Sequence, residues 1–218
     1  MSSREAILGR VRTALADVPR STPEADVPLS WGYGAPTIPE TGFDLLDLFV
    51  ERVEDYRAVV ERCGPGEVAG RIAAALGGVG SVVLPSGVPD AWRDAVGAAG
   101  LELRADEPAL SRRELDATGA VVTGAAVGIA ETGTIVLDHG PDQGRRALSL
   151  VPDVHVCVVR ADQVVGGVPE AIVRLADAVA SGAPLTWISG PSATSDIELQ
   201  RVEGVHGPRT LHVILVQE

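Results

Sequence analysis

The chain has 218 residues, of which 45% are hydrophobic and 22% are charged, and its formal net charge at pH 7 is −12. A chain of this length and composition can bury a substantial core, and it fits one α/β domain with an appendage. No run of Lys or Arg forms a stripe that could neutralise the phosphates of a nucleic acid or an anionic membrane, so we expect neither as a partner.

Short sequence features disfavour two further classes. The longest uncharged apolar stretch, residues 117–130, is shorter than the roughly 20 residues that a membrane-spanning helix needs. Residues 1–5 lack the apolar core of a secretion signal, so we expect a cytoplasmic protein. Cys63 and Cys157 are too few for a disulfide framework or a four-thiolate iron–sulfur site, and we expect both to be reduced and structural. No metal site is predicted.

A short amphipathic helix is expected at the start of the chain. Ser2 and Glu5 have the spacing of a capping box. Between residues 18 and 41 the composition shifts to Pro, Ser, Thr and Gly, which suits an extended tether. We therefore expect residues 1–42 to form a helical arm and linker, and residues 43–218 to form an α/β domain. The apolar face of the arm, which could pack in a groove of a partner, consists of Ile7, Leu8, Val11, Ala14 and Leu15.

The domain is expected to begin with two helices and to continue as alternating strands and helices. Apolar residues at helical spacing predict a long helix from Leu45 to Val60 that ends near Cys63, and a further helix over residues 67–76. The alternation that follows predicts a largely parallel sheet flanked by helices on both faces, with ligands outside the carboxyl ends of its strands. Helices are expected at 89–99, from 111 and at 169–181, and strands at 81–84, 101–104, 120–123, 134–138, 154–159, 185–189 and 211–216.

The first chemical candidate is the segment 188–198, where an apolar strand runs into a turn of small residues and then an acidic helix start. Backbone N–H groups and hydroxyls in such a loop, at the positive end of a helix dipole, could bind a small anion such as a metabolite carboxylate or phosphate. The alternative is that these side chains only cap the helix expected from Ile197. The candidate ligand-binding residues are Gly190, Ser192, Thr194, Ser195 and Asp196.

The second candidate is the segment 128–134, where one carboxylate interrupts an apolar run. Glu131 stands where a core residue is expected, and an ionised carboxylate there would need donors such as the Thr132 and Thr134 hydroxyls. It could serve as a nucleophile, a base or a ligand anchor, with Gly133 beside it in the binding site. The alternative is a hairpin turn with Glu131 solvated at its tip.

Two further loops carry polar groups. His206 lies in a Gly-rich turn, residues 204–208, and is a candidate catalytic imidazole, although such histidines are more often surface hydrogen-bonding groups. Arg145 lies in the polar loop 138–146 and could clamp a carboxylate bidentately, the alternative being a solvated charged turn. The sequence contains no Walker A loop, no Gly-x-Gly-x-x-Gly after a strand and no His-Glu-x-x-His.

The segments 130–134, 189–198 and 204–208 together closely resemble the lactate utilization (LUD) domain family. The resemblance covers residues 43–218 and the arm around residues 3–15. It implies a fold like that of the ribose-5-phosphate isomerase, CoA-transferase and formyltetrahydrofolate cyclo-ligase group. It also implies a role in oxidising L-lactate to pyruvate alongside two iron–sulfur partner subunits, whose cysteine clusters this chain lacks.

Three functional hypotheses follow. In the first, the chain is a subunit of a lactate-oxidising system, and Glu131 and His206 face a small anion bound at the Ser192 loop. In the second, it is a free-standing enzyme of the acyl-transfer or isomerase type, with Glu131 as nucleophile or base. In the third, it only stabilises a complex. The residues identify neither the ligand nor whether a flavin or nucleotide cofactor binds.

Overall fold

The structure is a computed structural model, and it describes residues 2–17, 44–191 and 207–217. The chain divides into two units, Met1–Ala35 and Pro36–Glu218, and each is described by itself. In the first unit, helix α1 (Ser3–Ala14) begins at the expected capping box, in which the Ser2 hydroxyl accepts the Glu5 N–H and the Glu5 carboxylate accepts the Ser2 N–H. No side chain of α1 is buried, so its apolar face is exposed.

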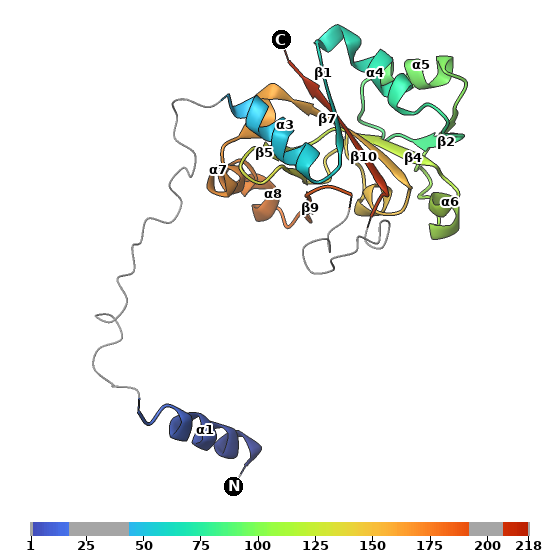
Figure 1. Ribbon diagram of the computed structural model, residues 1–218. Helices are drawn as coiled ribbons and strands as arrows, with labels where there is room; N and C mark the ends of the chain where they lie inside the picture. Colours follow the sequence, from blue (N-terminus) through green and yellow to red (C-terminus); the bar gives the residue numbers. More distant parts are fainter. Residues whose placement is uncertain (1, 18–43, 192–206, 218) are drawn as a thin grey trace. The chain divides into compact units, whose positions relative to one another are not determined.

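The second unit is built on a six-stranded sheet in which every neighbouring pair is parallel, in the order β1-β10-β7-β4-β2-β3 (Figure 1). This confirms the predicted α/β class with a largely parallel sheet. The central strands consist of apolar, mostly β-branched residues, as expected where both faces are covered. The strands are β1 (Val59–Cys63), β2 (Ser81–Val83), β3 (Glu102–Arg104), β4 (Ala120–Thr123), β7 (Val154–Arg160) and β10 (Thr210–Val216).

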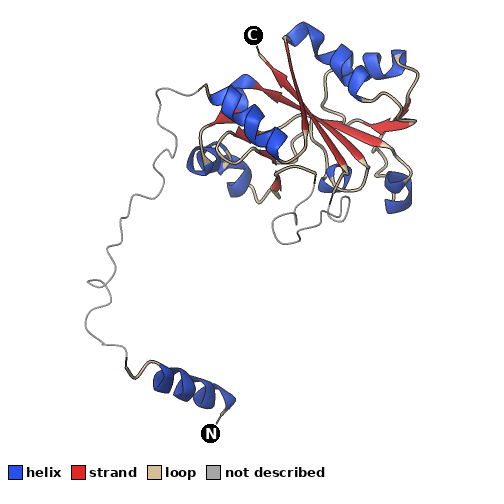
Figure 2. Cartoon of the chain, in the orientation of Figure 1, coloured by secondary structure: helices blue, strands red, loops and turns tan. Residues whose placement is uncertain are grey.

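Helices α4 (Val68–Ala75) and α5 (Asp90–Ala98) cover one face of this sheet, where Ile72 and Val96 are fully buried (Figure 2). Helix α3 (Leu45–Asp55) covers the other face. Short helical segments connect the remaining strands: η1 (Pro65–Glu67), α6 (Arg112–Asp116), η2 (Arg146–Ser149) and η3 (Ala161–Gln163). Helix α6 begins at the second expected capping box, formed by Ser111 and Glu114.

A second, smaller sheet has four strands in the order β8-β5-β6-β9. Strand β6 is antiparallel to both of its neighbours, so β5 and β6 form a hairpin. Helix α7 packs on the outer face of this sheet through Ala171 and Leu175. The strands are β5 (Val127–Ile129), β6 (Thr134–Leu137), β8 (Val164–Val165) and β9 (Thr186–Ile188), and the helices are α7 (Val168–Arg174) and α8 (Ala176–Ala180).

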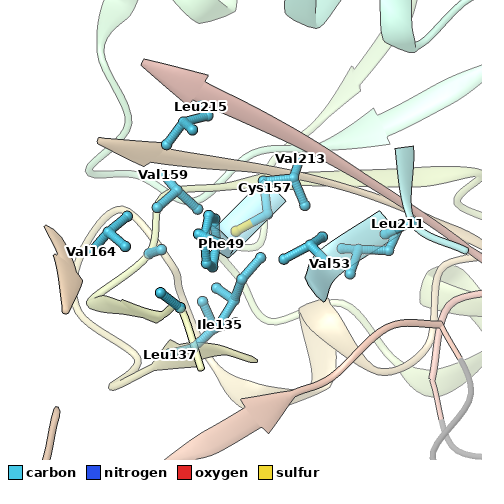
Figure 3. Close-up of a cluster of buried hydrophobic side chains, with 13 residues drawn as sticks. Phe49, Val53, Ile135, Leu137, Cys157, Val159, Val164, Leu211, Val213 and Leu215 are labelled. Carbon is cyan, nitrogen blue, oxygen red and sulfur yellow. The ribbon is translucent and has the colours of Figure 1, made fainter. Parts of the chain in front are cut away.

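Phe49 of α3 lies at the centre of the core between the two sheets (Figure 3). Its side chain is fully buried, with Val159 and Val213 of the large sheet on one side and Ile135 of the small sheet on the other. Gly128 makes room for the ring, because a Cβ at that position would lie 3.1 Å from Phe49 Cε2. Burying a Phe side chain stabilises a fold by about 1.5–3 kcal/mol, so this contact anchors α3 between the sheets.

The predicted long helix over residues 45–60 is wrong after Asp55. Helix α3 ends at Asp55, and Val59–Cys63 forms strand β1, which pairs in parallel with β10. The helical spacing of apolar residues continues through Tyr56 to Val60 by coincidence. The chain reverses at Arg57, whose φ of 64° lies in the left-handed region, and pairing with a distant strand overrides the local pattern.

The structure differs from the sequence expectations in two other ways. Strands β5 and β8, of three and two residues, were not predicted. The helix predicted over residues 169–181 divides at Leu175 into α7 and α8.

A chain of buried polar side chains crosses the middle of the large sheet. His155 Nε2 lies 2.8 Å from Thr123 Oγ1, the Thr123 hydroxyl reaches Cys157 Sγ at 3.7 Å, and Cys157 Sγ donates to the Gly124 carbonyl at 3.6 Å. This order is consistent if His155 donates from Nε2. Its Nδ1 is buried and has no hydrogen-bond partner within the described ranges. Burial lowers the pKa of His155 to about 4, and burial raises the pKa of Cys157 to about 12.

This buried histidine predicts a loss of stability at mildly acidic pH. Between its ordinary pKa of 6.5 and its folded value of about 4, His155 is protonated in the unfolded chain and neutral in the folded chain. The free energy of unfolding therefore falls as the pH falls, by about 2 kcal/mol from this group between pH 7 and pH 5. Urea unfolding of the wild type and His155→Gln over this range should show that the variant loses most of the dependence.

Thr123→Val is the matched control, because it removes the hydrogen-bond partner and leaves the imidazole buried. It should lower stability at every pH and keep the wild-type slope. Equal slopes in the wild type and His155→Gln would contradict the assignment.

Candidate functional site

The segment from Ala130 to Gly133 is the turn of the β5–β6 hairpin. Glu131 is exposed in this turn, and its backbone N–H donates to the Gly166 carbonyl at 3.0 Å. Glu131 therefore does not occupy the core position that the apolar run suggested but lies in a hairpin turn, and its role at a ligand site stays a prediction. The reason is that the run divides into two antiparallel strands, which place the carboxylate at the turn between them.

Three hydroxyl side chains meet at the turn end of this hairpin. Thr132 Oγ1 donates to Thr134 Oγ1 at 2.8 Å, and Thr134 Oγ1 lies 2.8 Å from Ser189 Oγ. The alternative acceptor for the Thr134 hydroxyl, the Thr132 carbonyl, is farther away at 3.5 Å. The shorter contact favours donation from Thr134 to Ser189, which leaves the Ser189 proton available for a further acceptor. We call these three residues the hydroxyl cluster.

Two glycines of the predicted site hold the hairpin and the loop after β9 against the last turn of α3. A Cβ on Gly133 would lie 2.5 Å from the backbone carbon of Arg52, and a Cβ on Gly190 would lie 2.4 Å from Tyr56 Cβ. Both glycines have positive φ, 58° and 80°. Glycine is required here by backbone conformation and by close approach, so its presence has a structural reason apart from any ligand.

The hydroxyl cluster lies at the amino edge of the large sheet. Tyr56, which Gly190 contacts, precedes strand β1 by three residues. Arg209, just before β10, also lies at this edge, where it forms an ion pair of 3.3 Å with Asp153, just before β7. Five of the predicted site residues lie outside the described residues: Ser192, Thr194, Ser195, Asp196 and His206.

Arg145 does not join the hydroxyl cluster. It follows the opposite end of β6, and the three residue steps from Thr134 to Leu137 span about 10 Å. Arg145 does clamp a carboxylate bidentately, but that carboxylate is Asp106, with Nε to Oδ2 at 2.7 Å and Nη2 to Oδ1 at 2.8 Å. The hydrogen bond that Arg145 donates to Asp106 lowers the pKa of the Asp106 carboxyl group and raises the pKa of Arg145.

The loop 138–144 lies across the carboxyl ends of β2 and β4. The Gly87 N–H, just after β2, donates to the Pro141 carbonyl at 2.9 Å, and the Gly124 N–H, just after β4, donates to the Asp142 carbonyl at 3.0 Å. The Asp142 carboxyl group covers Gly124, where a Cβ would lie 2.1 Å from Oδ2. Burial raises the pKa of Asp142.

His139 is a feature of this loop that the sequence patterns did not single out. Its φ of 61° is left-handed, a conformation that is costly for a residue other than glycine and that concentrates at functional sites. Its Nδ1 lies 2.9 Å from the Gly144 carbonyl and must donate, so Nε2, 2.8 Å from Thr186 Oγ1, accepts. Gln143 is 3% exposed and accepts the N–H groups of Asp138 and His139.

No group of three or more His, Cys, Asp or Glu side chains in residues 2–17, 44–191 and 207–217 is placed to hold a metal ion. None of the helices within these ranges combines the length and the apolar character needed to cross a bilayer.

Comparison with known proteins finds one family and several close relatives. The family model described as the LUD domain matches residues 30–216. Lactate utilization protein C of Deinococcus radiodurans is 49% identical over 215 residues, which are 99% of this chain and 97% of that protein. Lactate utilization protein C of Geobacillus kaustophilus is 32% identical over 70% of each chain.

The chain is also similar to a solved structure. The crystal structure of a DUF162 family protein from Deinococcus radiodurans matches with a TM-score of 0.70 and 47% identity, covering 79% of this chain and 96% of that one. The likeness to the isomerase and CoA-transferase group stays a prediction.

The close approach of Gly133 to α3 predicts an unequal cost for two glycine substitutions. Gly133→Ala adds a left-handed alanine and a clash with the Arg52 backbone, which together should cost about 2–5 kcal/mol. Gly78→Ala is the matched control, because Gly78 has a φ of 85° with no atom within 4 Å of a Cβ, and it should cost only about 1–2 kcal/mol. Urea denaturation measures both, and equal losses would show that α3 does not hold the hairpin.

Proposed function

This chain belongs to the LUD domain family, and on that premise we propose that it acts in lactate utilization, as a cytoplasmic subunit that binds a small carboxylate such as lactate or pyruvate. The observation that carries the proposal is the 49% identity to a lactate utilization protein C over nearly the whole of both chains. Similarity that spans arm and domain alike supports a shared role rather than a shared fold alone.

Oxidation of L-lactate to pyruvate releases two electrons and two protons, so the electrons need an acceptor. Cys63 and Cys157 are the two cysteines of the sequence, and both are buried, in hydrophobic clusters on opposite faces of the large sheet. They cannot ligate an iron–sulfur cluster between them, since such a cluster takes about four thiolates. We therefore assign the electron transfer to iron–sulfur partner subunits and the handling of the small acid to this chain.

The proposed site for the acid is the hydroxyl cluster. Because Thr132 donates its proton to Thr134, and Thr134 donates to Ser189, the Ser189 hydroxyl is the member of the cluster that supplies a donor for a carboxylate. In this proposal Glu131, beside the cluster, and His206 exchange protons with the bound acid. The remaining predicted ligand residues, Ser192, Thr194, Ser195 and Asp196, belong to the same proposal on sequence grounds.

Calorimetric titration of the full chain with sodium pyruvate and L-lactate tests the binding. We expect saturable binding with a Kd of roughly 0.1 to 1 mM, as three or four net hydrogen bonds supply. Thr134→Val removes the central hydroxyl and should weaken binding about three- to tenfold. Asp177→Asn, an exposed charge on α8, is the control and should bind like the wild type. Wild-type affinity in Thr134→Val would place the acid elsewhere.

Glu131→Gln separates the proposed subunit from the alternative enzyme. In a complex reconstituted with iron–sulfur subunits, the variant should keep its pyruvate affinity and lose roughly a hundredfold of lactate-dependent dye reduction. A covalent acyl adduct on wild-type Glu131 after incubation with an acyl-CoA, absent in Glu131→Gln, would instead establish an acyl-transfer enzyme.

A further inference from the structure

A cavity of about 520 Å³ opens at the carboxyl ends of β2 and β3, at the other end of β6 from the hydroxyl cluster. Its walls come mainly from three segments, residues 84–86 after β2, residues 105–107 after β3 and the loop 139–148, and are completed by Arg93 of α5 and by Pro184. Cavities of roughly 300–1,000 Å³ bury most of a drug-sized organic molecule. The position outside the carboxyl ends of parallel strands is where open α/β sheets bind ligands.

The cavity carries positive charge in a chain whose net charge is −12. Arg93, Arg145 and Arg146 line it, against the two carboxylates Asp106 and Glu107. Because Asp106 is paired bidentately with Arg145, the charges left over are those of Arg93, Arg146 and Glu107. The excess of one positive charge is a local reversal of sign, and it selects an anion.

The two remaining arginines differ in how they are held. Arg93 Nη2 donates to the carbonyls of Pro85 and Ser86 at 2.6 and 2.7 Å, which fixes the guanidinium on the cavity wall. Its neighbouring carboxylate, Asp90, is 3.9 Å away and almost fully exposed, so it neutralises little of the charge. The Arg146 guanidinium makes no hydrogen bond or ion pair with the described residues. It has all five donors available for a phosphate or carboxylate.

The loop that carries Arg145 and Arg146 is built to stay in place. Gln143, His139 and Gly87 hold it through the hydrogen bonds described above, and Arg145 ties its end to Asp106 and to the Leu110 carbonyl. A cation on a fixed loop loses little freedom when it binds an anion, so the site is preorganised.

The rest of the lining indicates the body of the ligand. Ala105, Pro141 and Pro184, which are exposed, supply apolar wall that a small inorganic anion or a three-carbon acid would leave uncovered. The exposed carboxylate of Glu107 is an acceptor for hydroxyl groups. An anionic head, a hydroxylated middle and a flat apolar body together describe a nucleoside monophosphate.

We propose that this carboxyl-edge cavity is a second ligand site, which binds a nucleoside monophosphate with its phosphate on Arg146 and Arg93 and its base against the exposed apolar wall of Ala105, Pro141 and Pro184. The site does not depend on the proposed lactate function, because no residue of the hydroxyl cluster lines it. The chain lacks the Walker A and Gly-x-Gly-x-x-Gly motifs. The phosphate is therefore held by arginine side chains rather than by a glycine-rich backbone loop.

Equilibrium binding of AMP to the full chain, measured by calorimetry, tests the proposal. We expect one site per chain with a Kd on the order of 100 µM. Arg146→Gln should weaken AMP binding at least tenfold. Arg209→Gln removes the same charge at the opposite edge of the sheet, where its exposed ion pair with Asp153 contributes little, and it should bind AMP like the wild type. Inorganic phosphate and adenosine, the two halves of the probe, should each bind at least tenfold more weakly than AMP.

Three results would overturn the proposal: no saturable AMP binding up to 5 mM, equal AMP affinity in the wild type and Arg146→Gln, or inorganic phosphate binding as tightly as AMP. Thr134→Val distinguishes this site from the proposed carboxylate site. It should leave AMP affinity unchanged whether or not it alters pyruvate binding, and a loss of AMP affinity in Thr134→Val would place the nucleotide at the hydroxyl cluster instead.

Discussion

The position of helix α3 is the constraint on which the amino edge of the molecule depends. Phe49 and Val53 on one side of the helix are buried between the two sheets, so the helix cannot shift without opening the core. The last turn of the same helix then sets the place of the hairpin and of the loop after β9, because Gly133 and Gly190 lie against its backbone and Tyr56. A side chain at either glycine would push the hydroxyl cluster away from its present geometry.

Strand β6 connects this edge to the opposite one. At its start, Thr134 is hydrogen-bonded within the hydroxyl cluster, and after its end the chain enters the loop that holds His139 and the arginines. The large sheet follows the general rule that ligand cavities lie at the carboxyl ends of parallel strands. The hydroxyl cluster does not follow it, because the antiparallel hairpin carries the chain back to the amino edge. One strand thereby separates two chemically different regions, one of neutral hydroxyls and one of arginines.

Local interactions could be predicted from the sequence, and distant pairings could not. The capping boxes at Ser2 and Ser111 were predictable because both partners lie within three residues. The strand at residues 59–63 was not, since its pairing with β10 depends on residues about 150 positions away.

The candidate site shows the same division. The hairpin around Glu131 was one of two readings that periodicity allowed, and only the pairing of β5 with β6 decides between them. The partner of Arg145, Asp106, lies 39 residues earlier in the chain, so no spacing rule indicated that this arginine would be neutralised within its own chain. Arg146, which the sequence did not distinguish from its neighbour, is left to face the cavity.

The central claim is that the hairpin turn, the hydroxyl cluster and the α3 terminus form one ligand-binding region. Amide NMR spectra of the full chain, recorded during a titration with sodium pyruvate, test it most directly. We expect saturable chemical-shift changes at Thr132, Gly133, Thr134, Ser189 and Gly190, and unchanged resonances for Gly78 and the residues of α4 and α5. Shifts confined to other surfaces, or none at saturating pyruvate, would contradict it.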